Sequence, residues 1–183
     1  NCILLLLSCK FFLCRAAILE FMQWIIAGLG NPGEEYTGSR HNVGRDFVLA
    51  LTKKEGIEGW KADKKVRGLL TKGVLAGKKA IFVLPDTYMN LSGGSLKTLI
   101  PSKKAAEGLV VIQDDLDLPL GSFKMSFGAG SGGHKGIDSI QKALKTKDFT
   151  RIRVGITPAT PSGKLRKPDH KKIVDFVIGQ FRT

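Results

Sequence analysis

Two polar side chains that suit an active site follow the first short apolar run of the chain. Residues 24–27 are apolar, and residues 28–33 then hold three glycines and one proline, which force a tight turn. Asn31 lies in that turn, and His41, one of three histidines, lies in the next loop. Ligands in open α/β folds bind beyond the carboxyl ends of strands. The pair therefore predicts a small active site.

A second candidate group is acidic and follows the apolar residues 109–112. Asp114, Asp115 and Asp117 cannot all be buried cheaply, which places them at the rim of a strand end. They could bind a divalent metal, but no histidine lies at close spacing. We favour one carboxylate that orients a histidine, because such a contact fixes the tautomer and ring angle of the imidazole. An exposed acidic turn is the alternative.

A glycine-rich stretch at residues 128–136 contains His134 and Lys135. Glycines let backbone N–H groups approach an anion or a ribose closely. A flexible linker is the alternative, but a helix predicted at residues 137–144 favours a functional loop at a helix N-terminus.

A second amide, Asn90, lies within residues 85–93, just before a predicted helix at residues 93–100. Ser92 is a plausible N-cap for that helix. For Asn90 alone, a cap or turn role is the simpler explanation.

The glycines at positions 28, 30 and 33 also match the fingerprint of dinucleotide-binding proteins. That motif opens a helix directly and belongs to a βαβ unit. Here the polar residues 34–40 delay the next helix, and residues 69–75 and 79–84 predict a hairpin. A nicotinamide-dependent oxidoreductase is therefore disfavoured.

The remaining pattern predicts alternating helices and strands. Residues 42–54 read as a helix whose apolar face holds Val43, Phe47, Ala50 and Leu51. Residues 108–113 and 151–156 are predicted strands, and the latter places Arg151 and Arg153 on one side. Residues 61–67 are expected to form a solvated loop.

Composition points to a polyanionic partner. The 183 residues suit one domain, and the net charge of +13 favours nucleic acid first and an anionic membrane surface second. The three cysteines all lie in the first fourteen residues, which is compatible with a reducing cytoplasm. Residues 1–21 are apolar but too broken for a membrane span. We expect them to be a non-native or disordered extension, and residues 22–183 to be the functional domain.

Taken together, the motifs resemble those of bacterial-type peptidyl-tRNA hydrolases. They follow one another in the family's order: Gly28-Leu29-Gly30-Asn31-Pro32-Gly33 with Tyr36, Arg40-His41-Asn42 with Gly44, Tyr88-Met89-Asn90-Leu91-Ser92-Gly93, Asp114 with Leu116-Asp117-Leu118-Pro119, Gly132-Gly133-His134 with Gly136, and Arg151 to Ile156. The resemblance implies a single α/β domain with a mixed, twisted sheet and helices on both faces. It also implies hydrolysis of the ester between a peptide and the 3′ ribose of tRNA, without a metal or other cofactor.

The resemblance also implies roles for particular residues. His41 matches the general base that activates water, Asp114 the carboxylate that orients it, and Asn31 and Asn90 the amides that hold the substrate. The residues expected to bind substrate are Tyr36, Tyr88, Met89, Gly132, His134, Lys135, Arg153 and Lys124. The expected partner is peptidyl-tRNA rather than a membrane, and the expected state is a cytoplasmic monomer.

The chain departs from the family pattern at a few positions. Gln113 stands where a histidine is usual, and Lys135 where an asparagine is frequent. Ser126 replaces a lysine that binds tRNA, and Lys124 is the expected substitute. The family's C-terminal helix is expected to be absent. A non-catalytic RNA-binding protein of the same fold is the alternative, and the retained His41, Asp114, Asn31 and Asn90 argue against it.

Overall fold

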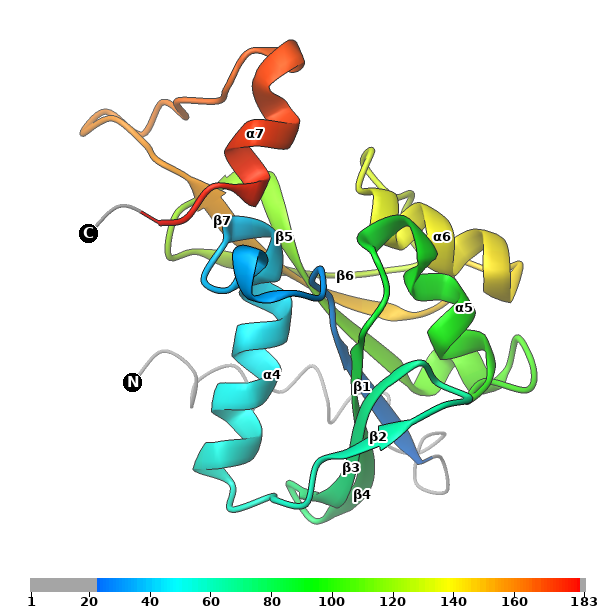
Figure 1. Ribbon diagram of the computed structural model, residues 1–183. Coiled ribbons are helices and arrows are strands. Elements are labelled where there is room, and N and C mark those ends of the chain that lie inside the picture. Colours follow the sequence, from blue (N-terminus) through cyan, green and yellow to red (C-terminus); the bar gives the residue numbers. More distant parts are fainter. Residues whose placement is uncertain (1–22, 182–183) are drawn as a thin grey trace.

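Seven strands of the described residues form one mixed sheet (Figure 1). The computed structural model describes residues 23–181, so the expectation for residues 1–21 lies outside it. The strands are β1 (Trp24–Gly28), β2 (Lys61–Asp63), β3 (Gly68–Leu75), β4 (Lys78–Pro85), β5 (Leu109–Pro119), β6 (Phe123–Phe127) and β7 (Thr150–Thr157). Their order is β2-β3-β4-β1-β5-β7-β6. Strand β1 is parallel to both of its neighbours, β4 and β5, and β5 is parallel to β7. The pairs β2–β3, β3–β4 and β6–β7 are antiparallel.

Helices cover both faces of this sheet, as predicted. Figure 1 shows α4 on one face, with α5 and α6 on the other. The α-helices are α4 (Val43–Lys54), α5 (Ser92–Lys97), α6 (Lys135–Leu144) and α7 (Ile173–Ile178). Short 3₁₀ turns lie at η1 (Glu34–Tyr36), η2 (Arg40–Asn42), η3 (Met89–Leu91), η4 (Ala105–Gly108) and η5 (His170–Lys172).

The central strands are apolar on both sides because both sides are covered. Alternate residues of β1 and β5 point to opposite faces: Ile26 and Val110 join the core under α4, whereas Ala27 and Val111 join the core under α5 and α6. The resulting sandwich holds the carboxyl ends of β1 and β5 side by side.

Two glycines allow α4 to start directly against those strand ends. A Cβ on Gly44 would lie 2.2 Å from the backbone oxygen of Ile112, and one on Gly28 would lie 2.5 Å from the backbone oxygen of Gly44. A side chain at either position would push the helix away from the sheet. The turn before α4 is therefore held close to the end of β5.

The predicted hairpin is confirmed, with β3 and β4 joined at Ala76 and Gly77. Both residues have positive φ, 50° and 78°, which is typical of the tight turn that matches strand twist. The turn after β1 leads into the 3₁₀ turn η1 rather than an α-helix, as the argument against a dinucleotide site requires.

Some local predictions were wrong. The buried face of α4 holds Gly44, Val48, Leu51 and Thr52, whereas Ala50 is exposed and Val43 and Phe47 are only partly buried. Residues 61–63 form strand β2 at the sheet edge instead of a loop.

The helix starts also differ from the predictions. Ser92 is the first residue of α5 rather than its N-cap, and its hydroxyl donates to the carbonyl of Met89. Helix α6 begins at Lys135, two residues earlier than predicted, because the side chain of His134 caps it.

Within residues 23–181, no helix combines the length and the apolar character needed to cross a bilayer.

Candidate active site

A cleft of about 1030 Å³ opens where β1, β5 and the starts of α4 and α6 meet. Most of the predicted site residues line it: Asn31, His41, Tyr88, Met89, Asn90, Asp114, Gly132, His134, Lys135 and Arg153. Tyr36, on η1, and Lys124, on β6, do not line it. These residues come from the turn after β1, η2, η3, β5, the start of α6 and β7, so segments that are distant in sequence converge on one cavity.

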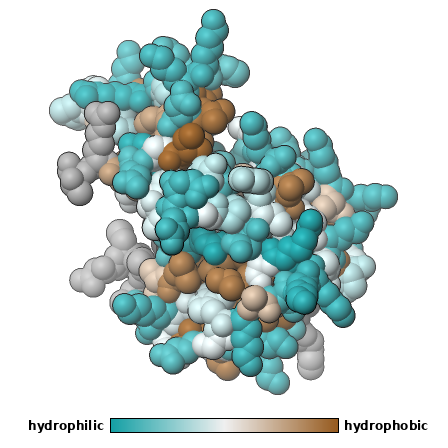
Figure 2. All heavy atoms as spheres, viewed as in Figure 1, coloured by the Kyte–Doolittle hydropathy of each residue, from teal (hydrophilic) through white to brown (hydrophobic). Residues whose placement is uncertain are grey.

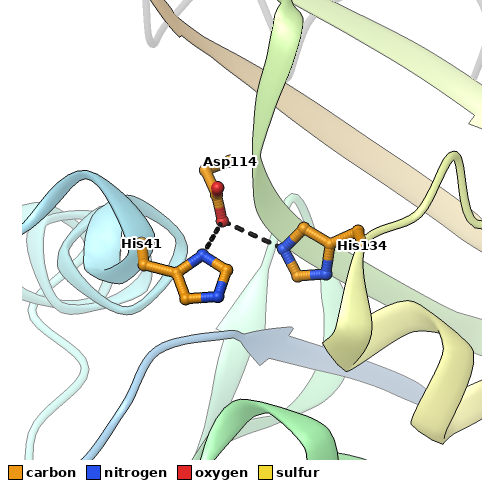
Figure 3. Close-up of side chains that lie close together, drawn as sticks. All are labelled: His41, Asp114 and His134. Atoms are coloured by element: carbon orange, nitrogen blue, oxygen red, sulfur yellow. Dashed lines mark hydrogen bonds and ion pairs between the residues drawn. The ribbon is translucent and has the colours of Figure 1, made fainter. Parts of the chain in front are cut away.

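Asp114 is the centre of the polar cluster. One carboxylate oxygen, Oδ1, lies 2.8 Å from Nδ1 of His41 and 2.9 Å from Nε2 of His134. Figure 3 shows the two rings approaching this carboxylate from η2 and from the start of α6. Only 3% of the Asp114 side chain is exposed, so the two histidines are its main source of polar contact.

This burial corrects the prediction that all three aspartates mark an exposed rim. β5 continues through them to Pro119, with a register shift against β7 after Asp115. The side chains then take separate paths: Asp115 pairs with Arg153 at 2.5 Å, and Asp117 pairs with Lys167 at 2.6 Å. The prediction of one carboxylate that contacts a histidine is confirmed for Asp114.

The hydrogen bonds of His134 fix its tautomer. Its Nδ1 accepts from the backbone N–H groups of Gly136 at 3.1 Å and Ile137 at 3.3 Å, which caps α6. A nitrogen that accepts cannot carry the proton, so in the neutral ring the proton lies on Nε2. His134 therefore donates to Asp114.

Asp114 is ionised in this arrangement. Burial alone would raise the pKa of its carboxyl, but the attraction and hydrogen bonds of His134 and His41 hold that pKa well below its ordinary value. An ionised carboxylate only accepts, so Nδ1 of His41 donates to it. In the neutral ring the lone pair therefore lies on the other nitrogen of His41, Nε2, and this ring lines the cleft.

Asn31 is held in one orientation by two neighbours. Its backbone N–H donates to Oδ1 of Asn42 at 2.8 Å, and Nδ2 of Asn42 donates back to the carbonyl of Asn31 at 3.0 Å. Its side-chain Oδ1 accepts from the N–H of Met89 at 2.8 Å. The amide Nδ2 of Asn31 is thereby left as a donor on the wall of the cleft.

The other predicted binding residues form the rim of the cleft. Tyr88 and Asn90 are exposed around η3, and Lys135 is the exposed first residue of α6. Gly132 and Gly133 both have positive φ, which glycine adopts at little cost, so the loop can turn sharply before His134.

The prediction did not anticipate several supporting residues. Asn42 belongs to the motif Arg40-His41-Asn42, but its two hydrogen bonds to Asn31 form only in the folded structure. Arg151 is buried and donates to the carbonyls of Gly130 and Ser131, so it anchors the glycine-rich loop. Arg40 fastens the last helix to η2. The sequence feature that could have pointed to these residues is an amide or a basic side chain within an otherwise apolar strand or a tight turn.

Gln113 is almost completely buried, and it donates from Nε2 to the backbone carbonyl of Asp114 at 3.1 Å. This bond goes to the backbone of Asp114 rather than to its carboxylate. An amide does not titrate near neutral pH, so Gln113 supports the strand and relays no proton to Asp114.

Comparisons with known proteins identify relatives of this chain. The profile of the family described as peptidyl-tRNA hydrolase matches residues 25–183. A protein of Caldanaerobacter subterraneus subsp. tengcongensis named peptidyl-tRNA hydrolase is 42% identical over 160 residues, which span 87% of this chain and 80% of the relative. One from Bacillus subtilis is 43% identical over 158 residues, which span 86% of this chain and 79% of the relative. The crystal structure of peptidyl-tRNA hydrolase from Acinetobacter baumannii matches with a TM-score of 0.76 and 34% identity, covering 87% of this chain and 77% of that one.

Proposed function

The chain belongs to the peptidyl-tRNA hydrolase family, and we propose that it cleaves the ester between a peptide and the 3′ ribose of tRNA with His41 as general base. The observation that carries the assignment of the base is the shared carboxylate of Asp114. Because Nδ1 of His41 donates to it, Nε2 is the nitrogen that can take a proton from water.

The reaction then follows from the positions of these groups. A water next to Nε2 of His41 loses a proton as its oxygen attacks the ester carbonyl, and Asp114 stabilises the imidazolium that forms. The carbonyl oxygen gains negative charge, and Nδ2 of Asn31 is a preorganised donor for it. The proton held by His41 then passes to the departing 3′ oxygen, which releases tRNA and the peptide.

Asn90 and Tyr88 are placed to contact the substrate rather than to assist the general base. Asn90 and Tyr88 are exposed at the cleft rim, where an amide and an aromatic ring can contact the terminal nucleoside. Across the sheet, Lys124 lies opposite Arg153 in register, which puts two cations beside each other near the cleft. We assign them to the tRNA backbone, with Lys124 as the exposed cation and Arg153 held in place by its ion pair with Asp115. The +13 net charge of the chain suits such a partner.

A direct test incubates the full chain with peptidyl-tRNA and measures the release of free tRNA. Release above the uncatalysed rate supports the proposal. Tight tRNA binding without release would favour a non-catalytic RNA-binding protein, which has no need for an aligned histidine–aspartate–histidine cluster. All the proposed catalytic groups belong to one chain, so we further propose that a monomer is sufficient for activity. We also propose that the protein acts in the cytoplasm.

Activity is expected to be independent of metal ions. His41, Asp114 and His134 are close enough together to suggest a metal site. However, a metal on Nε2 of His134 would displace the proton that Asp114 accepts, while Nδ1 is occupied by the N–H groups that cap α6. We expect the rate of tRNA release to be unchanged in EDTA. Loss of activity in EDTA and its return with a divalent cation would contradict this mechanism.

Lys135 is expected to contact a phosphate of the tRNA 3′ end. It lines the cleft at the first position of α6, where the helix dipole disfavours a cation unless an anion is near. Lys135→Ala should weaken binding of the substrate and reduce the slope of log affinity against log salt by roughly one unit. The rate at saturating substrate should change little.

The control for this prediction is Lys142→Ala, since Lys142 is an exposed lysine in the last turn of the same helix. Its salt slope should equal that of the wild type. An unchanged slope in Lys135→Ala would mean that Lys135 points into solvent. A lower saturated rate with normal binding would instead assign Lys135 a catalytic task.

A further inference from the structure

Helix α7 forms an apolar wall of the cleft. The cleft is lined on this side by Ile173, Val174, Val177 and Ile178. Val174 is 53% exposed and Ile178 is 36% exposed, although both are large apolar side chains. Figure 2 shows hydrophobic side chains gathered over the position of α7, beside hydrophilic ones. Such a wall suits the acyl part of a substrate and not its phosphates.

Helix α7 is too short to be stable without contacts to the rest of the chain. It has six residues, and isolated helices of that length are unstable in water. Val177 is its only buried residue. Contacts with the rest of the chain must therefore keep α7 in place.

Arg40 supplies several of these contacts. Its Nη1 donates to the carbonyl of Phe176 at 3.1 Å and to that of Gly179 at 3.0 Å, which are carbonyls at the end of α7. Its guanidinium lies 4.4 Å from the ring centroid of Phe176 and 5.4 Å from that of Phe181. A cation at the C-terminal end of a helix and over an aromatic face is favourable on both counts.

The backbone reinforces the same junction. The N–H of Arg40 donates to the carbonyl of Gly179 at 3.1 Å, and Ser39 forms an antiparallel bridge with Gln180. Arg40 is also the residue next to His41 within η2. One short turn therefore holds both the catalytic base and the apolar wall.

We infer that Arg40 is a positioning residue that fixes α7 relative to His41 and thereby sets the affinity for the acyl part of the substrate. This inference rests on the proposed function. Arginine suits the role because Nη1 donates to both carbonyls while the planar guanidinium stays over the ring of Phe176, and the compact ammonium of a lysine does not reproduce that planar stacking.

The test compares Arg40→Lys with the wild type on two substrates. One is an N-acetylated leucyl-tRNA and the other is an N-acetylated glycyl-tRNA, so they differ in the side chain next to the ester. For Arg40→Lys, KM for the leucyl substrate should rise roughly tenfold, because one apolar side chain in a pocket is worth an effect of that size. KM for the glycyl substrate should change by about twofold or less, since glycine has no side chain to place on the wall. The kcat and its pH profile should be unchanged for both.

Two further variants sharpen the comparison. Arg166→Lys makes the same change at an exposed arginine and should leave both KM values as in the wild type. Phe176→Leu keeps Arg40 but removes the ring under its guanidinium, and it should raise KM for the leucyl substrate in the same direction. This second variant also tests the inference if Arg40→Lys fails to fold.

Unchanged KM values in both Arg40→Lys and Phe176→Leu would overturn the inference. So would a loss of kcat with a shifted pH profile for both substrates, which would mean that Arg40 acts on His41 instead. If the wild type released tRNA from neither substrate, the proposed function would fail first, and that outcome is distinct from both.

Discussion

Replacing His41 by alanine should lower kcat by about 10²–10⁴-fold, the usual cost of losing a general base. His41 is the residue whose Nδ1 donates to Asp114 and whose Nε2 is left to take a proton from water. Binding of tRNA should remain nearly normal, because the imidazole acts on the water rather than on the phosphates. Single-turnover measurements of tRNA release, with binding measured separately, would check this.

The matched control is the third histidine of the chain. His170 lies on η5 and also lines the cleft, but it is exposed, and among the described residues it has no hydrogen bond to Asp114 or to the other two histidines, so it has no role in the proposed proton transfer. His170→Ala should keep kcat within about threefold of the wild type, far less than the loss expected for a general base. A His41→Ala protein with near-normal kcat would contradict the assignment of His41 as the general base. Equal losses in the two variants would point to a general effect on folding.

Asp114→Asn should lower kcat by about 10²-fold and retain measurable activity. The amide oxygen can still accept from Nδ1 of His41 and Nε2 of His134, so the tautomers are kept. What disappears is the negative charge that stabilises the imidazolium in the transition state. The expected loss is thus smaller than the roughly 10⁴-fold loss seen in a triad whose histidine takes the wrong tautomer.

The same substitution should change how stability depends on pH. The pKa of Asp114 is lowered on folding, so its contribution is present above the unfolded value, about 4, and is lost as pH falls toward the folded value. Asparagine does not titrate. The difference in free energy of unfolding between wild type and Asp114→Asn should therefore shrink progressively as pH falls below about 4.

Denaturant titrations at several pH values would measure that difference. A difference that stayed constant with pH would mean that Asp114 is not the ionised partner of the two histidines. If Asp114→Asn also matched the wild-type kcat, Asp115 or Asp117 would become the better candidate for orienting His41.

Local patterns in the sequence were sufficient for much of the fold. The continuous apolar run at β1 predicted a buried strand, and the glycines after it predicted a tight turn. Together they placed Asn31 at the carboxyl end of that strand. The hairpin at Ala76 and Gly77 and the helix α4 followed from equally local rules. The motifs shared with a known family supplied the reaction and the role of His41.

Only the tertiary structure decided how those groups work together. His41 and Asp114 are 73 positions apart, and His134 lies a further 20 positions along the chain, yet all three meet at one carboxylate oxygen. No local rule could predict that His134 caps α6 with Nδ1 and so must donate from Nε2. The burial of Asp114, beside two aspartates with other partners, likewise depends on which strands and helices pack against β5. Side-chain partners of this kind are set by packing across the sheet, which a periodicity within one segment does not encode.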